Sequence, residues 1–346
     1  MRALTISAHG GLDKLEFRED LPVAPVPPGH VRVRLRAAAL NHLDLFVVEG
    51  LPGVTITPPW IMGADGAGVI DVGDGEFAAG DAVVINPGIS DRTCPNCLEG
   101  EQSLCVNFRL LGEHLPGTFA ESVVIPTQNV AKIEMGKELT DDQFANAAAF
   151  PLAALTAWRM MVTRARVQPG EDVLIWGIGG GVAVACLQIA KLIGARAWVT
   201  SSSDAKLAHA KALGADEVYN HRNVDVAREI RTRTGKRGVD VVIDNVGQAT
   251  WKQSLSALRK GGRLVSCGAT SGPLAEIDIR KLFWNQWELL GSTMGNDAEF
   301  AAVVGEFNKG NLVPHVDSVY DLAEGRLAFE HLQRGEQFGK IVLRVR

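Results

Sequence analysis

The chain has 346 residues, more than one hydrophobic core usually holds, so we expect two domains. Hydrophobic residues make up 46% and charged residues 22%, as in ordinary globular proteins, and a net charge of −5 leaves no basic excess for nucleic acid. Five cysteines are too few for a disulfide framework and indicate a reducing compartment; with no apolar signal segment at the start, we expect a cytoplasmic protein.

Residues 1 to about 130 contain short apolar runs separated by glycine and proline, for example at 30–40 and 80–88. This texture predicts a β-rich domain, and we find no sustained helical periodicity in it. An alanine-rich stretch at 140–162 follows, and it begins with acidic residues. Thr140 is a candidate N-cap, so the stretch predicts a helix.

From 171 to 293, strand-like and helix-like segments alternate, which predicts βαβ units and a doubly wound parallel sheet. After Gly295 we expect one helix, and then a strand that returns to the first domain. The run at 173–190 is apolar, but its four glycines and Gln188 favour a buried strand, a turn and a helix over a membrane span.

A glycine cluster follows the buried strand "DVLIW" and precedes an apolar helix. Gly177, Gly180 and Ala183 fit a G-x-x-G-x-x-A spacing. Glycines permit a tight turn and close approach of a pyrophosphate, whose charge the N-terminus of a helix stabilises. We therefore predict a dinucleotide site here.

The end of the next strand bears on which dinucleotide binds. Ser201, Ser202 and Ser203 stand where an NAD site usually has an acidic residue. Lys206 and Arg222 are near enough in sequence to bind a 2′-phosphate, although Ser203 also fits a helix cap. These residues favour NADPH, with NADH the less favoured coenzyme.

The segments "MGADGAG", "GVDVVIDNVG" and "FGKIVL", with the glycine turn, resemble the medium-chain dehydrogenase/reductase superfamily over essentially the whole chain. The resemblance implies a GroES-like β-rich catalytic domain at 1–153 and 294–346. It also implies a Rossmann dinucleotide-binding domain at 154–293, an active site in the cleft between the two, and a homodimer or homotetramer.

In zinc-dependent relatives the catalytic metal is held at positions that match Asn41, Ala64 and Leu152 of this chain. These residues do not form a zinc site. The sequence looks closer to the quinone oxidoreductase and enoyl reductase branches, which implies NADPH-dependent hydride transfer to a quinone, enone or other carbonyl without a catalytic metal. The alternatives are an NAD(P)-dependent alcohol or aldehyde dehydrogenase and a non-catalytic NADPH-binding protein.

The catalytic candidates are Asn41, His42 and Asp65, of which His42 could protonate an enolate or merely line the cleft. Lys340 would pair with Asp44 or Asp65, and we favour a structural role for both acids. The cofactor-binding candidates are Thr156, Gly177, Gly179, Gly180, Gly181, Val182, Ser201, Ser202, Ser203, Lys206, Arg222, Val246, Gly247, Gly268, Met294 and Lys340.

The loop "DRTCPNCLEGEQSLC" carries Cys94, Cys97 and Cys105. Its spacing is similar to that of the superfamily's structural zinc lobe, with Asp91 at the first ligand position. The resemblance implies one structural zinc held by these four residues, because carboxylate oxygen is an acceptable zinc ligand. The alternative is a metal-free lobe with buried or oxidised cysteines.

Overall fold

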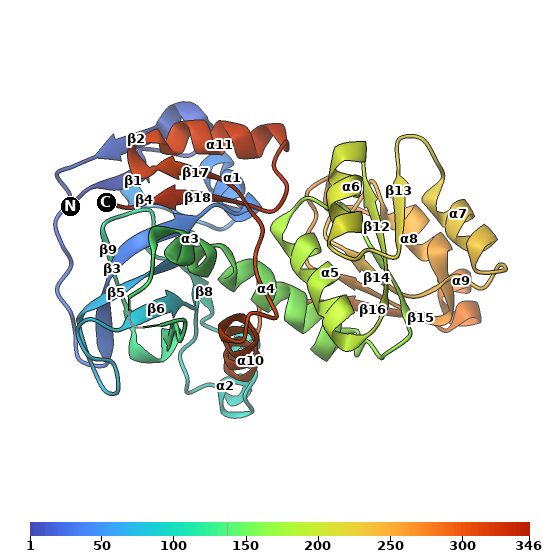
Figure 1. The fold of residues 1–346 in the computed structure, drawn as a ribbon, viewed down its shortest axis with the longest axis horizontal. Helices are drawn as coiled ribbons and strands as arrows, with labels where there is room; N and C mark the ends of the chain where they lie inside the picture. The colour runs from blue at the N-terminus through green and yellow to red at the C-terminus, as the bar shows by residue number, and fades with distance from the viewer. Residues whose placement is uncertain (137) are drawn as a thin grey trace. The chain divides into compact units, whose positions relative to one another are not determined.

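The computed structural model describes residues 1–136 and 138–346, and the chain divides into two compact units. The first unit comprises Met1–Leu155 and Gly295–Arg346, and the second comprises Thr156–Met294. The first unit is rich in strands and the second contains a parallel sheet between helices (Figure 1), while the domain bounds 1–153, 294–346 and 154–293 stay a prediction.

The first unit is built on a twisted sheet with strand order β10-β6-β5-β3-β18-β17, and β9 also pairs with β3. The strands are β3 (His30–Ala39), β5 (Asp65–Val72), β6 (Ala82–Ile85), β9 (Ser122–Pro126), β10 (Val130–Lys132), β17 (Val316–Asp321) and β18 (Lys340–Arg344). A smaller sheet contains β1 (Ala3–Ile6), β2 (Leu15–Arg18) and β4 (Trp60–Ile61). A two-stranded sheet pairs β7 (Gly88–Ile89) antiparallel with β8 (Arg109–Leu110). The core between these sheets is apolar because the strands alternate: Val31, Val33 and Leu35 of β3 are buried.

One expectation for this unit was wrong, because a helix lies within the first 130 residues. α1 (His42–Glu49) begins after Asn41, whose backbone N–H donates to Asp44 Oδ2 at 2.7 Å. This contact is part of a capping box, a start signal that strand-like neighbours obscured. Because apolar residues lie on several sides of the helix, its sequence shows no clear polar face.

The helix at the alanine-rich stretch was predicted correctly. Thr140 Oγ1 accepts the N–H of Gln143 at 3.2 Å at the start of α3 (Asp141–Ala149). Pro151 then opens α4 (Pro151–Trp158). Proline fits the first turn of a helix, where its missing N–H costs nothing.

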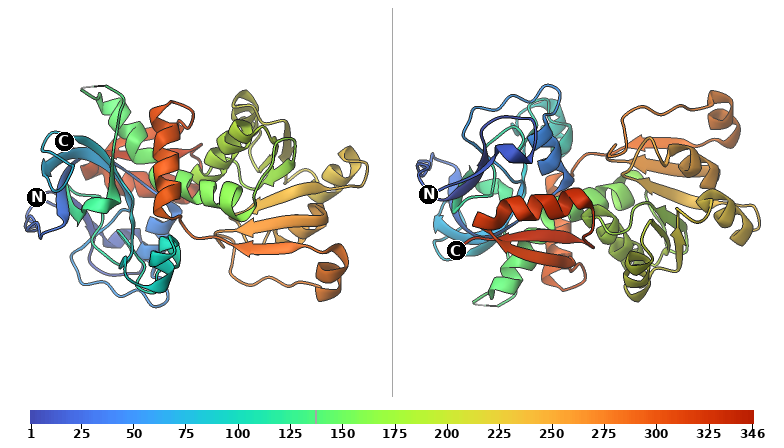
Figure 2. Two further views of the ribbon diagram at one scale, coloured as in Figure 1. Left: turned by 90° about the horizontal axis from the view of Figure 1, so that it is seen from below. Right: turned by 90° about the horizontal axis from the view of Figure 1, so that it is seen from above.

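The C-terminal segment contains more elements than one helix and one strand, so that expectation was incomplete. α10 (Asp297–Asn308), β17 and α11 (Gly325–Arg334) precede β18, which pairs antiparallel with β3. α11 packs along β17 and β18, as Figure 2 shows. When the chain returns to the first unit, it therefore adds two strands, β17 and β18, to the sheet, and α11 covers them.

The second unit is a parallel sheet with the order β13-β12-β11-β14-β15-β16. Helices cover both of its faces (Figure 1), so the doubly wound prediction is confirmed. Its strands are β11 (Asp172–Ile175), β12 (Arg196–Ser201), β13 (Glu217–Asn220), β14 (Val239–Asp244), β15 (Leu258–Ser266) and β16 (Glu288–Gly291). Its helices are α5 (Gly181–Ile193), α6 (Asp204–Ala212), α7 (Val226–Arg233), α8 (Trp251–Ala257) and α9 (Ile279–Asn285).

The strand order reverses between β11 and β14, and ligands of open α/β sheets bind at the carboxyl ends of the strands beside such a point. The outer edge of β16 pairs with no other strand in the described residues, and the homodimer or homotetramer stays a prediction. Within residues 1–136 and 138–346, no helix combines the length and the apolar character that crossing a membrane requires.

Candidate functional site

The glycine turn after β11 has the backbone shape that a pyrophosphate requires. Gly177 and Gly179 have φ values of +71° and +131°, which side-chain-bearing residues rarely adopt. Gly180 caps α5 without a side-chain hydrogen bond to the helix, so the N–H groups of Gly181 and Val182 are not capped by a side chain. The turn therefore offers free backbone donors at the positive end of a helix dipole.

Two side chains approach this turn. Lys206 Nζ lies 3.3 Å from the point that a Cβ on Gly179 would occupy. Asn245 Oδ1 is buried without a hydrogen-bond partner in the described residues, 3.8 Å from the corresponding point on Gly177. A nearby cation and an unpartnered amide oxygen fit a polar, anionic cofactor. Asn245 was missed in the sequence, where it is an ordinary residue after a strand.

The serine run lies at the carboxyl end of β12. Ser203 Oγ accepts the N–H of Lys206 at 3.4 Å, so it does cap α6. Ser201 pairs in register with Asn220 of β13, and Asn220 Oδ1 accepts the N–H of Arg222 at 3.1 Å. Ser202 sits between the two other serines. The strand ends thus bring the serines near the backbone of the exposed Arg222.

An acidic residue, Asp204, also lies in this region, and the prediction of NADPH from the sequence did not consider it. Asp204 begins α6, directly after the serine run, and its Oδ1 accepts from Asn220 Nδ2 at 2.7 Å. A carboxylate is therefore present at the end of β12, one position later than the serines. Its hydrogen bond to β13 holds it on the surface beside Asn220.

The loops after β14 and β15 are shaped by a buried acid. Asp244 Oδ1 accepts the N–H groups of Val246 and Gly247, both at 2.9 Å. A Cβ on Gly247 would stand 2.9 Å from Ala269 Cα, and one on Gly268 would stand 3.0 Å from the carbonyl oxygen of Asn245. These glycines therefore allow the two loops to approach closely, at the carboxyl ends of the strands.

Thr156 and Met294 meet in the second unit, at its two junctions with the first unit in sequence. The Thr156 hydroxyl donates to the Met294 sulfur at 3.8 Å, and both residues are buried. Met294 also has a left-handed backbone, with φ of +48°. The contact fixes both ends of the second unit side by side.

A buried polar network in the first unit includes Asn41, one of the three residues at which the resemblance places catalytic metal ligands. Lys340 Nζ contacts Asp65 Oδ2 at 2.9 Å and Asn41 Oδ1 at 2.5 Å. Asn41 Nδ2 donates to Asp65 Oδ2 at 2.9 Å, and the N–H of Leu152 donates to Asp65 Oδ1 at 2.9 Å. The side-chain polar atoms of Asn41, Asp65 and Lys340 all have a hydrogen-bond partner, and the three side chains are buried.

Asp44 lies beside this network without a cation of its own. Burial raises the pKa of Asp44 to about 7, against the backbone N–H groups of Asn41 and Gly63 and the nearby Lys340, which lower it. The negative charge of Asp65 adds to the upward shift. One lysine thus serves two buried carboxylates, and burial brings the pKa of Asp44 close to neutral pH.

His42 is exposed at the first position of α1, next to Asn41. It differs from Asn41 and Asp65, which are buried within the network. Of the three catalytic candidates, His42 is the one whose side chain reaches solvent.

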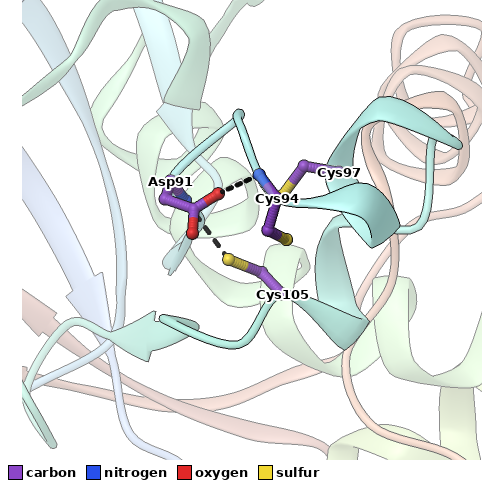
Figure 3. A group of neighbouring side chains, drawn as sticks. All are labelled: Asp91, Cys94, Cys97 and Cys105. Carbon is purple, nitrogen blue, oxygen red and sulfur yellow. Dashed lines mark hydrogen bonds between the residues drawn. The ribbon is translucent and has the colours of Figure 1, made fainter.

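The four residues of the cysteine loop converge, as Figure 3 shows. One ligand atom each from Asp91, Cys94, Cys97 and Cys105 lies within 4.8 Å of the others. A tetrahedral zinc with Zn–S bonds of about 2.3 Å fits a group of this size. The donor set, three sulfurs and a carboxylate, therefore suits a closed structural zinc site.

The loop's hydrogen bonds orient these ligands. Asp91 Oδ1 accepts the N–H groups of Thr93 and Cys94, both at 2.9 Å, and with Asn107 these donors hold the pKa of Asp91 well below its usual range. Cys105 Sγ accepts the N–H of Asp91 at 3.3 Å. Similar donors lower the pKa of Cys94, whereas burial raises the pKa of Cys97 to about 11. A bound cation would reverse the rise at Cys97.

The cysteine lobe is anchored on α10 of the same unit. Arg92 forms a salt bridge with Asp297, the first residue of α10, and the N–H of Asp297 donates to Gln102 Oε1 at 3.3 Å. These contacts indicate a structural role for the lobe.

The environment of Asp44 predicts how stability depends on pH. Because its pKa is raised to about 7 in the folded chain, the folded state binds this proton more tightly than the unfolded state. The stability that this group contributes is therefore lost as pH rises from 4 to 7. Asp44→Asn removes this loss. The difference in the free energy of unfolding, variant minus wild type, should therefore rise by about 2 kcal/mol from pH 5 to pH 8, as measured by urea unfolding.

Asp65→Asn is the matched control for Asp44→Asn. It leaves Lys340 buried without its carboxylate, so it should destabilise the chain at both pH values by about 3–5 kcal/mol. If the difference between Asp44→Asn and wild type does not change with pH, the proposed protonation of Asp44 is wrong.

The geometry of the cysteine loop predicts bound zinc. Purified protein should contain about one zinc per chain by elemental analysis, and removing the metal should lower the melting temperature, since a structural site contributes folding energy. Asp91→Ala should reduce zinc retention during dialysis against chelator. Asp20→Ala, which changes an exposed acid paired with Arg18, should not. A zinc content below about half an equivalent in untreated protein would contradict this assignment.

Comparison with known proteins identifies both units. The alcohol dehydrogenase GroES-like domain family matches residues 27–135, and the zinc-binding dehydrogenase family matches residues 181–309. A zinc-type alcohol dehydrogenase-like protein of Schizosaccharomyces pombe is 32% identical, over 97% of this chain and 96% of that protein. The quinone oxidoreductase of Homo sapiens is 29% identical, over 99% of this chain and 97% of its own.

Solved structures agree. A crystal structure described as an NAD-dependent alcohol dehydrogenase is 44% identical, covers both chains completely and superposes with a TM-score of 0.94. The 2-octenoyl-CoA carboxylase reductase CinF, solved with NADP and 2-octenoyl-CoA, is 27% identical with a TM-score of 0.90, over 99% of this chain and 87% of its own. This chain therefore belongs to the medium-chain dehydrogenase/reductase superfamily of oxidoreductases.

Proposed function

We propose that the protein is an NADPH-dependent reductase that transfers hydride to a quinone or an α,β-unsaturated carbonyl without a catalytic metal. The observation that carries this proposal is the buried group of Asn41, Asp65 and Lys340. Asn41 matches one metal-ligand position of zinc-dependent relatives, and Asp65 follows the second, Ala64, and accepts the N–H of the third, Leu152.

The donor set at these positions does not suit zinc. Ala64 is fully buried and has no ligand atom, and Leu152 contributes only a backbone N–H, which Asp65 accepts. The Asp65 carboxylate is already neutralised by Lys340. Without a Lewis acid, a simple alkoxide is not stabilised, whereas a conjugated acceptor spreads the developing charge over its own atoms.

The chain's own residues then have distinct roles. Asn41 is a positioning residue, because its amide oxygen and nitrogen are both held by buried partners. Asp65 anchors that amide and the ammonium of Lys340. His42 adjoins Asn41 on the exposed side of α1, and we assign it the role of hydrogen-bond or proton donor to the acceptor's oxygen.

The bound dinucleotide would supply the hydride, and the glycine turn would hold its pyrophosphate. Lys206 beside Gly179 supports NADPH, as do the serines at the end of β12 and the exposed Arg222. CinF, a relative solved with NADP, is consistent with this choice.

An NAD(P)-dependent alcohol or aldehyde dehydrogenase is the second candidate. The 44% identical structure carries the description of an NAD-dependent alcohol dehydrogenase, and Asp204 places a carboxylate near the end of β12. A non-catalytic NADPH-binding protein would share the glycine turn but would show no turnover. Kinetics separate the three.

The proposed reaction predicts acceptor-dependent oxidation of NADPH. Absorbance at the nicotinamide band should fall with quinones or enones, and the rate should survive chelator at a temperature where the chain stays folded. Simple primary alcohols with NADP or NAD should give little or no reduction of the coenzyme. His42→Asn should lower kcat/KM by about 100-fold if His42 donates the proton.

Two results would oppose the proposed reaction, and a third would oppose only the role of His42. Tight NADPH binding without turnover on the whole panel would favour the binding protein. Alcohol oxidation that chelator abolishes while the chain remains folded would favour the dehydrogenase. An unchanged kcat/KM in His42→Asn would remove His42 from the reaction without deciding its class.

The position of Lys206 predicts the source of coenzyme selectivity. Lys206→Gln should raise the KM for NADPH about tenfold or more and leave the KM for NADH nearly unchanged, since only NADPH has the phosphate that the ammonium would bind. Lys211→Gln, on the same helix but bonded to the carbonyl oxygen of Asp216, is the matched control. Equal effects of Lys206→Gln on both coenzymes would show that the lysine does not bind the 2′-phosphate.

A further inference from the structure

A cavity lies wholly within the first unit, and none of its lining residues belongs to the glycine turn. Its volume is about 650 Å³. Five arginines and three acids line it together with apolar residues, and the acids are Asp71, Glu121 and Asp141. The protein as a whole has a net charge of −5, so this lining is a local reversal of charge.

Strand geometry creates the basic row in this cavity. Arg32, Arg34 and Arg36 alternate along β3 with buried Val33 and Leu35, so the three arginines share one face of the strand. Residues two apart on a strand stand roughly 7 Å from each other. Three arginines of one strand therefore line the same cavity.

The two outer arginines are already held by acids. Arg32 pairs with Asp71 at 2.6 Å, and Arg36 pairs with Asp141 at 2.6 Å. Arg36 also lies over the ring of Phe144, with Cζ 5.3 Å from the ring centroid. These contacts fix the orientation of the row at both ends.

The central arginine differs from its neighbours. Arg34 is exposed, and its side chain makes no hydrogen bond or salt bridge within residues 1–136 and 138–346. At the other side of the cavity, Arg2 pairs with Glu121 and donates to the carbonyl oxygen of Arg346. Arg346 faces Asp321 at 3.8 Å, so among the five arginines of the lining Arg34 is the one without an acidic partner in the described residues.

We propose that this cavity binds a small phosphate-bearing molecule with an apolar body. A guanidinium presents a fork of N–H donors that matches phosphate oxygens, so Arg34 would hold the phosphate between the fixed Arg32 and Arg36. Val23, Leu35 and Val345 provide an apolar wall. The volume lies within the range of about 300–1,000 Å³ of small-molecule sites. This site is separate from the proposed coenzyme site and does not depend on the proposed reaction.

Calorimetric titration of the full chain with phenyl phosphate tests the proposal. NADPH is present at saturation, so that the glycine turn is occupied. We expect saturable binding of one molecule per chain, weakening as salt is added. Inorganic phosphate, which has no apolar body, should bind several-fold more weakly.

Variants locate the bound phosphate. Arg34→Gln should weaken phenyl phosphate binding about tenfold or more, and Arg34→Lys should weaken it less, because lysine keeps the charge but loses the fork. Arg18→Gln is the control, since Arg18 is an exposed arginine paired with Asp20 outside the cavity. Unchanged melting temperatures establish that each variant is folded.

Two outcomes would overturn the proposal. The first is the absence of saturable binding in the wild-type chain. The second is binding that Arg34→Gln leaves unchanged but Lys206→Gln abolishes, because the ligand would then occupy the glycine turn. Neither outcome bears on NADPH oxidation, so this test fails separately from that of the proposed function.

Discussion

The buried ion pair between Lys340 and Asp65 is the contact on which the first unit depends. It joins β18 to β5, and through Asn41 and the N–H of Leu152 it also holds the starts of α1 and α4. These segments are far apart in sequence, and leaving either charge buried alone would cost about 3–5 kcal/mol. The pair therefore requires that all four segments meet at one point.

The same contact limits the chemistry that this point can perform. A carboxylate that already accepts from an ammonium, an amide and a backbone N–H has little capacity left to bind a metal or to exchange a proton with a substrate. Under the proposed function, chemistry in this region falls to groups at the edge of the network. His42 is the candidate, because it is exposed at the start of α1 while Asn41 is buried.

Local signals in the sequence were sufficient to predict the second unit, because strand, glycine turn and helix follow one another without interruption. They were insufficient for α1, whose apolar residues lie on several sides and whose start signal is a single Asn–Asp pair. Contacts between distant segments were also out of reach. No local pattern predicts that Asn220 binds Asp204 beside the serine run. Nor does one predict that Asp71 and Asp141 pair with the arginines on either side of Arg34 and not with Arg34 itself.

The Asp65 and Asp91 clusters of the first unit differ in whether the protein itself supplies a cation beside the carboxylate. The Asp65 cluster contains its own cation, since Lys340 lies inside it, and it is complete as a group of protein atoms. The Asp91 cluster contains none: its nearest arginine in sequence, Arg92, turns its side chain to Asp297 on α10. A bound cation would therefore replace repulsion among ionised ligands with attraction to one centre. The Asp91 cluster could thus hold a metal, whereas the proposed function places none at the Asp65 cluster.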